Sequence, residues 1–266
     1  MSSTAHRPVA LVTGASSGIG FELAKQFAEN GFDLILAAED DELALAAREL
    51  DAGETQVHAV RVDLATEEGV EELYRQLTDT GRPLDAAALN AGRGAGGAFA
   101  TDTRLEDELE IVDLNVRSVV QLSKYIVRDM VSRGQGRILY TSSIASTMPG
   151  SFQAVYNASK SFVQSFALAL RNELKDTGVT ITSLMPGPVE TEFFERANMD
   201  HDTKVGTSDK DDPADVARDG FTALMNGDER VVSHSLSSKL QGVGSRVLPD
   251  SLKAELHRKM AEPGTD

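Results

Sequence analysis

The chain has 266 residues and carries 42 acidic against 26 basic side chains, a formal net charge of −16 with neutral histidines. Apolar residues make up 41% of it, which is enough for a large core and argues against wholesale disorder. The acidic balance argues against nucleic acid or an anionic membrane surface as the main partner, because like charges repel. Cysteine is absent, which excludes disulfides, thiol nucleophiles and cysteine-ligated metal centres.

Neither a membrane span nor a signal peptide is expected. The chain has no run of about 18 apolar residues, and Met1–Pro8 is not followed by a long apolar core. A cytoplasmic protein is the expectation, for which the lack of cysteine is typical. No metal site is expected, because the five histidines are scattered without ligand spacing. They are His6, His58, His201, His234 and His257.

Short apolar runs alternate with longer amphipathic ones. The apolar runs predict strands at Pro8–Thr13, Asp33–Ala38, Gln56–Val62, Leu84–Leu89, Arg137–Thr141 and Val179–Met185. Helical spacing predicts helices at Ile19–Asn30, Asp41–Leu50, Glu67–Asp79, Leu105–Arg133 and Gln153–Thr177. This alternation is typical of an α/β fold, in which a doubly wound parallel sheet is covered by helices on both faces.

The C-terminal third is less regular. Glu190–Asp215 holds nine acids and three bases and is too polar to pack as core. Asp212-Pro213 predicts a helix through Met225, Arg230–Ser233 predicts a further strand, and Lys239–Ala261 is helical in pattern with an interruption at Pro249. The sheet pattern never restarts, so one domain over residues 1–266 is expected, with residues 236–266 as a C-terminal extension.

A glycine-rich turn separates the first predicted strand from the first helix. It reads Thr13-Gly14-Ala15-Ser16-Ser17-Gly18-Ile19-Gly20. In this context Gly14 allows a tight turn, Gly18 allows a pyrophosphate to approach the backbone, and Gly20 allows the helix to pack close to the sheet. The free N–H groups at the helix start then face the phosphates. The alternative is a plain strand–helix turn, which needs only one glycine.

The spacing Thr-Gly-x-x-x-Gly-x-Gly resembles that of the short-chain dehydrogenase/reductase family. Matching motifs follow in register over residues 8–192: Asn90-Ala91-Gly92, with Leu89 where the family has another Asn, then Tyr156-Asn-Ala-Ser-Lys160, and Pro186-Gly187. The resemblance implies a single-domain Rossmann-like sheet of about seven strands. It also implies an NAD(P)-dependent oxidoreductase that transfers a hydride between the nicotinamide and a secondary alcohol or ketone.

The resemblance, with the charge at Glu39, implies a set of cofactor-binding residues. They are Gly14, Ser16, Ser17, Gly18, Ile19, Gly20, Glu39, Asp63, Leu64, Asn90, Ala91, Gly92, Tyr156, Lys160, Pro186, Gly187, Val189 and Thr191. In the family, the acid matching Asp63 contacts the adenine ring and the residue matching Thr191 bonds the nicotinamide carboxamide. Thr191 is also a candidate N-cap of a short helix, and both roles can hold at once.

The catalytic set implied by the resemblance is Asn115, Ser143, Tyr156 and Lys160. Tyr156 and Lys160 are four residues apart and share a helix face, so the ammonium is expected to lower the pKa of the phenol. Tyr156 then exchanges a proton with the substrate oxygen. Ser143 follows the fifth strand, where its hydroxyl faces the ligand crevice and stabilises charge on that oxygen, while neighbouring Ser142 points away.

Asn115 lies among apolar residues of the long predicted helix. A buried Asn usually satisfies backbone groups. In the family, the matching Asn holds a water that links the lysine to solvent, and this proton relay is the role expected of Asn115.

The end of the second predicted strand bears on the choice of cofactor. In the family, Asp at the place of Ala38 selects NAD, and a base at the place of Glu39 or Ser17 selects NADP; this chain has none of them. It has Glu39, Asp40 and Asp41, which would face a 2′-phosphate without a cation. One unit charge at 4 Å costs roughly 1 kcal/mol in water and about 4 at an effective dielectric of 20.

NAD is therefore predicted, with Glu39 or Asp40 accepting from ribose hydroxyls. NADP remains the alternative, because Arg61 can fold over a phosphate. The acids also fit the start of the next helix, where its dipole favours them.

Substrate contacts in the family come from the regions matching Ile144–Phe152 and Glu190–Asp212. Residues 190–215 are expected to form a lid, with a surface loop as the alternative. Phe193, Phe194 and Met199 are its apolar anchors, and only Arg93 and Arg196 offer a partner to a carboxylate. We expect a medium-sized, largely apolar ketone or alcohol.

The two long helices resemble those through which the family forms homodimers and homotetramers. Two other functions stay open: a nucleotide-binding sensor without turnover, and a lyase or epimerase on the same fold. The intact catalytic set argues against the sensor, which needs no general base.

Overall fold

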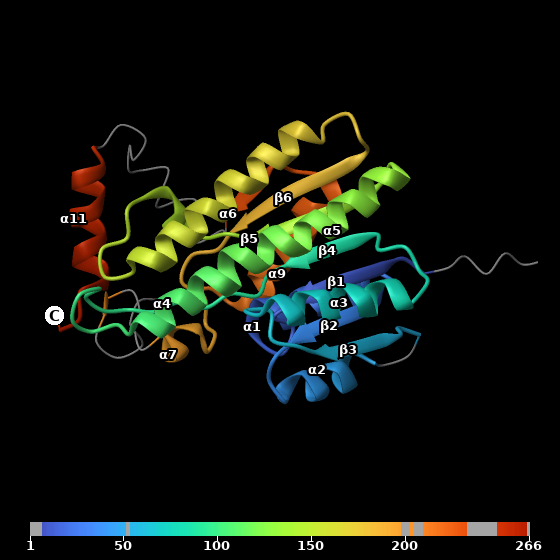
Figure 1. Ribbon diagram of the computed structural model, residues 1–266, viewed down its shortest axis with the longest axis horizontal. Helices are drawn as coiled ribbons and strands as arrows, with labels where there is room; N and C mark the ends of the chain where they lie inside the picture. Colours follow the sequence, from blue (N-terminus) through green and yellow to red (C-terminus); the bar gives the residue numbers. More distant parts are fainter. Residues whose placement is uncertain (1–6, 52–53, 198–202, 205–209, 233–248, 265–266) are drawn as a thin grey trace, which may run out of the picture.

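The centre of the molecule is one parallel seven-stranded sheet in the order β3-β2-β1-β4-β5-β6-β7. The computed structural model describes residues 7–51, 54–197, 203–204, 210–232 and 249–264 (Figure 1). The strands are β1 (Val9–Thr13), β2 (Asp33–Ala38), β3 (Val57–Arg61), β4 (Ala86–Leu89), β5 (Gly136–Thr141), β6 (Val179–Met185) and β7 (Arg230–Val232). The predicted doubly wound α/β sheet is confirmed, including a seventh strand.

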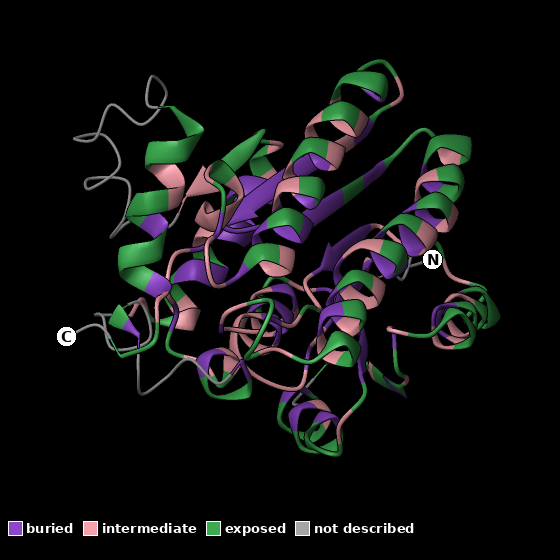
Figure 2. Ribbon diagram, turned by 60° about the vertical axis from the view of Figure 1, so that its left-hand side comes forward, coloured by how far each residue is buried: buried purple, intermediate pink, exposed green. Residues whose placement is uncertain are grey.

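Helices cover both faces of the sheet (Figure 1). Those of the first face are α3 (Glu67–Asp79), α5 (Ser118–Arg133) and α6 (Ala154–Glu173); those of the second are α1 (Gly18–Glu29), α2 (Glu42–Leu50) and α9 (Pro213–Asn226). Every residue of β1, β2 and β4 is buried as a result, as the purple strands of Figure 2 show. Double burial explains why these strands are continuous apolar runs rather than alternating ones.

The long predicted helix Leu105–Arg133 is interrupted once. It consists of α4 (Leu105–Val112), a π-helical turn over Asp113–Arg117, and α5. The wider turn carries Asn115, which is only 1% exposed. Single π-turns inside α-helices occur often at functional sites.

The C-terminal elements are α7 (Phe193–Arg196) and α11 (Asp250–Ala261). Helix α11 packs on the loop after β5, where the Ser151 hydroxyl donates to the Ala254 carbonyl at 3.0 Å. The predicted lid is described only in part, since Met199 lies outside the described residues, as do His6, His201, His234 and the expected helical stretch 239–248.

The predicted helix Gln153–Thr177 is shorter than expected, because turns follow Glu173. Over the described part of the chain, no helix is long and apolar enough to cross a membrane. Within the same residues, no group of three or more His, Asp or Glu side chains is placed to hold a metal.

Candidate active site

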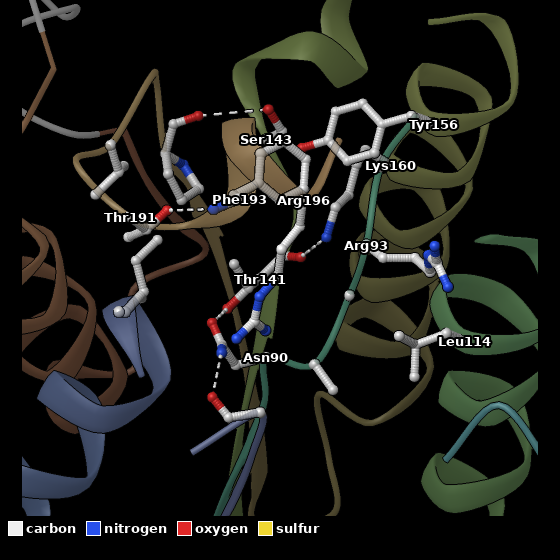
Figure 3. Close-up of a pocket in the computed structure, with 18 of the residues that line it drawn as sticks. Asn90, Arg93, Leu114, Thr141, Ser143, Tyr156, Lys160, Thr191, Phe193 and Arg196 are labelled. Atoms are coloured by element: carbon white, nitrogen blue, oxygen red, sulfur yellow. Dashed lines mark hydrogen bonds between the residues drawn. The ribbon is translucent and has the colours of Figure 1, made fainter. Parts of the chain in front are cut away.

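A cavity of about 720 Å³ opens where the C-terminal ends of the central strands meet (Figure 3). In a doubly wound sheet this edge is where ligands bind. Every residue predicted from the sequence for cofactor binding or catalysis lines the cavity, except Gly20 and Asn115. Residues from the whole length of the chain thus come together in one place.

The glycine turn forms one wall of the cavity. Gly14 and Gly18 have φ of +64° and +56°, which side-chain-bearing residues rarely adopt. A Cβ on Gly18 would lie 2.8 Å from Thr191 Cγ2, and one on Gly20 would lie 1.9 Å from the Gly14 carbonyl oxygen. Gly20 is therefore a packing residue beneath the turn, as its predicted role requires, and not part of the cavity surface.

The first turn of α1 fits a diphosphate. Ser17 is its N-cap and makes no side-chain capping bond, and the first turn holds no acidic residue. Its N–H groups are left for an external acceptor, and the helix dipole favours an anion there. The turn thus suits the diphosphate of a dinucleotide.

The turn after β4 is tied to its neighbours on both sides. The backbone N–H groups of Asn90 and Ala91 donate to the Thr13 hydroxyl at 2.9 and 3.0 Å. The Thr141 hydroxyl donates to Asn90 Oδ1 at 3.0 Å (Figure 3). These bonds hold the ends of β1, β4 and β5 in register beneath the cavity.

The acidic end of β2 is partly neutralised from within the chain. Asp40 accepts from the Ser16 hydroxyl at 2.9 Å. Arg61 pairs with Asp41 and donates from Nε to the Glu39 carbonyl at 2.9 Å. Arg61, the cation considered as a partner for the 2′-phosphate of NADP, is therefore already paired with an acid of this chain.

Glu39 itself is exposed at the cavity rim. Partial burial and the neighbouring carboxylates of Asp63 and Glu110 raise its pKa, while Arg93 opposes the shift. Arg93 pairs with Glu110 and lies 3.9 Å from Asp107, both on α4. Two carboxylates thus balance the charge of Arg93, and its role toward a substrate carboxylate stays a prediction.

Tyr156 and Lys160 lie one turn apart on α6, as predicted, with Lys160 Nζ 5.9 Å from the centre of the Tyr156 ring. Lys160 donates to the Thr141 carbonyl at 3.0 Å, and the Ser143 hydroxyl, which faces Tyr156 (Figure 3), donates weakly to the Pro186 carbonyl at 3.5 Å. All three side chains point into the same part of the cavity (Figure 3).

The pKa of Tyr156 moves opposite to the sequence expectation. Burial raises it to about 12, and the neighbouring Ser143 hydroxyl offsets this rise only in part. Burial also lowers the pKa of Lys160 to about 8. The desolvation of both groups outweighs their mutual attraction, so the phenol is neutral near neutral pH and is set to donate a proton.

The two serines after β5 have the predicted opposite orientations. Ser142 is buried and donates to the Lys160 carbonyl at 3.0 Å. Ser143 accepts from the Ala145 N–H at 3.1 Å and faces Tyr156. Strand alternation sends the first into the structure and the second into the cavity.

Asn115 lies beneath the cavity, and both atoms of its amide group are hydrogen-bonded. Its oxygen accepts from the Arg93 N–H at 3.0 Å, and its nitrogen donates to the Arg93 carbonyl and the Ser159 hydroxyl, both at 2.9 Å. The side chain thus satisfies backbone groups of Arg93, and the water relay stays a prediction.

The substrate end is built from four separate segments. The turn 93–99 bonds to two of them: Gly96 N–H donates to the Ala197 carbonyl at 3.1 Å, and Gly97 N–H to the Phe152 carbonyl at 2.9 Å. The fourth segment is α11. The apolar residues lining this end are Met148, Phe193, Phe194 and Met260.

Several lid residues meet the cavity directly, among them Phe193 and Arg196. The Phe193 ring lies 5.2 Å from the Tyr156 ring, centre to centre. Arg196 extends into the cavity (Figure 3). It pairs with Glu192 at 2.6 Å. Helix α7 begins after Glu192, so Thr191 is not its N-cap, although the Thr191 hydroxyl accepts weakly from the Phe193 N–H at 3.4 Å.

Comparison with known proteins agrees with this geometry. The family model described as short chain dehydrogenase matches residues 8–202. The chain belongs to this family. A similar curated protein is sulfoacetaldehyde reductase 2 of Chromohalobacter salexigens, 33% identical over 186 residues, which are 70% of this chain and 74% of the relative. The NADP-dependent 3-hydroxy acid dehydrogenase YdfG of Salmonella typhi is 32% identical over 199 residues, 74% of this chain and 79% of that one.

Solved structures show the same relationship. A short-chain dehydrogenase from Sphingobium yanoikuyae in complex with NADPH superposes with a TM-score of 0.78 at 26% identity, covering 91% of this chain and 96% of that one. As a short-chain dehydrogenase, the protein is an NAD(P)-dependent oxidoreductase.

Sequence reasoning missed part of this short-chain dehydrogenase site. His257 and Met260 line the cavity from α11. No spacing in the sequence connects them with the motif around Tyr156, about a hundred residues earlier. Such a contact depends on tertiary packing alone.

Proposed function

We propose that this short-chain dehydrogenase transfers a hydride between NAD and a secondary alcohol or ketone, with Tyr156 as the general acid and base. The observation that carries the proposal is the convergence of Tyr156, Ser143 and Lys160 in a cavity whose other wall is a glycine turn suited to a diphosphate. When bound, the nicotinamide supplies or accepts the hydride.

In the reductive direction, Tyr156 donates its proton to the substrate carbonyl oxygen. Ser143 donates a second hydrogen bond to that oxygen and stabilises its developing charge, because its hydroxyl proton is held only by a long contact of 3.5 Å to the Pro186 carbonyl and can turn to the substrate. The ammonium of Lys160 stabilises the phenolate left behind. Asn115 holds the turn at Arg93 in place through both atoms of its amide, and we keep for it the role of holding a water that links Lys160 to solvent.

The charges at the end of β2 support NAD over NADP in this proposal. Glu39 and Asp40 line the cavity, and Arg61 is paired with Asp41. The 2′-phosphate of NADP would meet a net negative surface. One unfavourable charge pair at an intermediate dielectric costs a few kcal/mol, and about 1.4 kcal/mol is tenfold in affinity. YdfG and the Sphingobium protein, whose names carry NADP and NADPH, show that the family also takes the other cofactor.

A fluorescence titration with NADH and NADPH tests the cofactor choice. We expect NADH to bind at least about tenfold more tightly. Glu39→Gln and Asp40→Asn should strengthen NADPH binding and so reduce the difference in affinity between the two cofactors. The control Glu29→Gln changes an acid away from the cavity and should leave this difference unchanged. Equal or tighter binding of NADPH by the wild type would overturn the NAD assignment.

The apolar side chains at the substrate end support a medium-sized, largely apolar ketone or alcohol. Consumption of the reduced cofactor with a panel of such ketones tests the reaction. Tight cofactor binding without turnover on any compound would indicate the sensor instead. Conversion of a compound with no net change in cofactor would indicate the lyase or epimerase.

We also propose that residues 1–266 form a single domain, with residues 190–215 as its lid.

We further propose that the chain self-associates through α4 and α6. A shallow apolar hollow lies between these helices, lined by Phe99, Val112, Val116, Val155 and the alanines beside them. A second copy that packs here would cover Phe99 and Val112, which are 61% and 41% exposed. Light scattering should give a dimer or tetramer that Val112→Asp dissociates. A monomer mass for the wild type would contradict the assembly.

A further inference from the structure

His257 on α11 is buried and connects three parts of the substrate end. It is 6% exposed, and its ring lines the cavity. Nδ1 lies 2.9 Å from the Ser151 carbonyl, and Nε2 lies 3.2 Å from Asn157 Nδ2. A carbonyl can only accept and an amide nitrogen can only donate, so the ring carries its proton on Nδ1 and is neutral.

Asn157 passes this contact on to the catalytic hydroxyls. It directly follows Tyr156 and is 1% exposed. Its Nδ2 also donates to the Ala145 carbonyl at 3.2 Å, and the Ala145 N–H donates to Ser143 Oγ at 3.1 Å. Ser143 faces Tyr156 in the cavity (Figure 3), and its hydroxyl donates weakly to the Pro186 carbonyl at 3.5 Å. A series of hydrogen bonds therefore runs from α11 to Ser143, through the residue that directly follows Tyr156.

The loop between them has a backbone that needs such support. Phe152 has φ of +63°, a conformation that is a genuine outlier for a bulky residue. Its ring lies under Arg258 of α11 at 5.3 Å, and the neighbouring Ser151 hydroxyl donates to the Ala254 carbonyl. A Cβ on Gly150 would lie 2.0 Å from Asn157 Cγ, so the loop packs directly on that amide. Strained backbone at a functional site persists only when its surroundings hold it.

We propose that His257 is a positioning residue, which holds the loop 144–153 through Ser151 and Asn157 and thereby keeps Ser143 and Tyr156 aligned on the substrate oxygen. This rests on the proposed reductase function. In this arrangement α11 is part of the active site: it closes the substrate end with His257 and Met260, whereas the cofactor end is complete without it. Burial lowers the pKa of His257, which keeps the ring in the neutral form that both bonds require.

The test compares three variants of the full chain. His257→Phe keeps a ring of similar size and removes both bonds. His257→Gln keeps one donor and one acceptor. Lys259→Gln changes an exposed residue of the same helix and is the control. We measure kcat and KM with a ketone substrate, the Kd of NADH, and the thermal midpoint.

For His257→Phe we expect kcat to fall about tenfold or more, because small misalignment of reacting groups is costly, while the Kd of NADH stays within about twofold. His257→Gln should recover most of the loss, and Lys259→Gln should match the wild type. An unchanged kcat in His257→Phe would overturn the proposal. So would a loss of NADH binding that parallels the loss of kcat, since a general structural role predicts that result.

A second variant approaches the same link from α6. Asn157→Ala should lower kcat at least as much as His257→Phe, and the double variant should be no worse than Asn157→Ala alone, because residues in one hydrogen-bond network are not additive. Full additivity would show that the two residues act separately. If His257→Phe does not fold, Asn157→Ala alone tests the link, and an unchanged kcat in that variant would overturn the proposal.

Hydrogen exchange gives a readout that does not depend on turnover. His257→Phe should speed exchange across residues 143–157 and leave the glycine turn 13–20 unchanged. If the wild type turned over no substrate, the reductase proposal would fail, while faster exchange confined to this loop would still support the link from His257. Unchanged exchange at residues 143–157 would contradict the proposed link between His257 and this loop.

Discussion

The two ends of the cavity are built in different ways. The cofactor end comes from turns that directly follow β1, β2 and β4, and its contacts are close backbone approaches such as Gly20 against Gly14. The substrate end comes from the turn 93–99, the loop 144–153, the lid and α11, joined by a few hydrogen bonds. The first end has no room to adjust, whereas the second can change its side chains while the sheet stays intact. We expect substitutions at the two ends to differ accordingly.

The largest effect should come from the residue where the two ends meet. Tyr156→Phe removes the proton that the substrate oxygen receives, and general acid–base catalysis contributes about 10²- to 10⁴-fold. We expect kcat to fall by about 10³-fold. The Kd of NADH should hold, because Ser143 and Lys160 stay in place. Steady-state turnover and a cofactor titration measure the two effects, and turnover close to that of the wild type would exclude Tyr156 as the acid.

The next effect belongs to the cofactor end. Gly20→Ala places a Cβ 1.9 Å from the Gly14 carbonyl oxygen, and backbone cannot move aside as a side chain can. Overpacking of this kind costs about 1–3 kcal/mol, and here it also displaces the phosphate-binding turn. We expect a lower thermal midpoint and NADH binding weakened by about tenfold or more.

The matched control is Gly31→Ala, at a glycine with φ of +83° and open space around it. This variant introduces backbone strain at a site remote from the cavity, so it should lower the thermal midpoint and leave the Kd of NADH unchanged. Equal loss of NADH affinity in both variants would show that general destabilisation, rather than the turn, is responsible.

The same contrast explains how far the sequence could predict the molecule. The cofactor end was predictable because its residues fall in short motifs between a strand and a helix, where local geometry decides their position. The pKa of Tyr156 was not, because the sequence shows the lysine four residues away but not the burial that outweighs it. Nor was the role of α11, since His257 reaches Asn157 only through tertiary packing. The sequence placed Asn115 in a regular helix, whereas it lies in a π-helical turn that directs its amide to Arg93 and Ser159; its relay role stays a prediction.

Lys160 links the two ends through its charge, and its pKa predicts a pH dependence. Burial lowers this pKa to about 8, so the ammonium that stabilises the phenolate is present below that pH and lost above it. Reductive kcat should be level below pH 8 and fall by up to about tenfold per pH unit above it. A level rate from pH 7 to about pH 10 would contradict the assignment.

Stability should change in the opposite direction, because the folded state disfavours the charged lysine. The unfolded chain binds this proton up to a pKa of 10.5, so its contribution to unfolding free energy rises with pH between about 8 and 10.5. Lys160→Met should therefore raise the thermal midpoint at neutral pH by about 2–4 °C per kcal/mol of desolvation removed, while it abolishes turnover. A lower midpoint would mean that the bond to the Thr141 carbonyl is worth more than the burial of charge costs.

The smallest effect should come from a glycine at the substrate end. A Cβ on Gly94 would lie 2.6 Å from Phe193 Cζ and 3.4 Å from Tyr156 Cδ2. The nearest atom is the tip of a ring on the lid, which can turn away where the backbone beside Gly20 cannot. For Gly94→Ala we expect KM for the ketone to rise about two- to threefold, with kcat, the Kd of NADH and the thermal midpoint unchanged. Adding Phe193→Leu removes the overlapping atom and should reverse the effect of Gly94→Ala relative to Phe193→Leu alone. Gly94→Ala could instead weaken NADH binding as strongly as Gly20→Ala does. The two ends of the cavity would then behave as one rigid unit. Strain at the lid would have reached the phosphate-binding turn through the contact between Thr191 and Gly18.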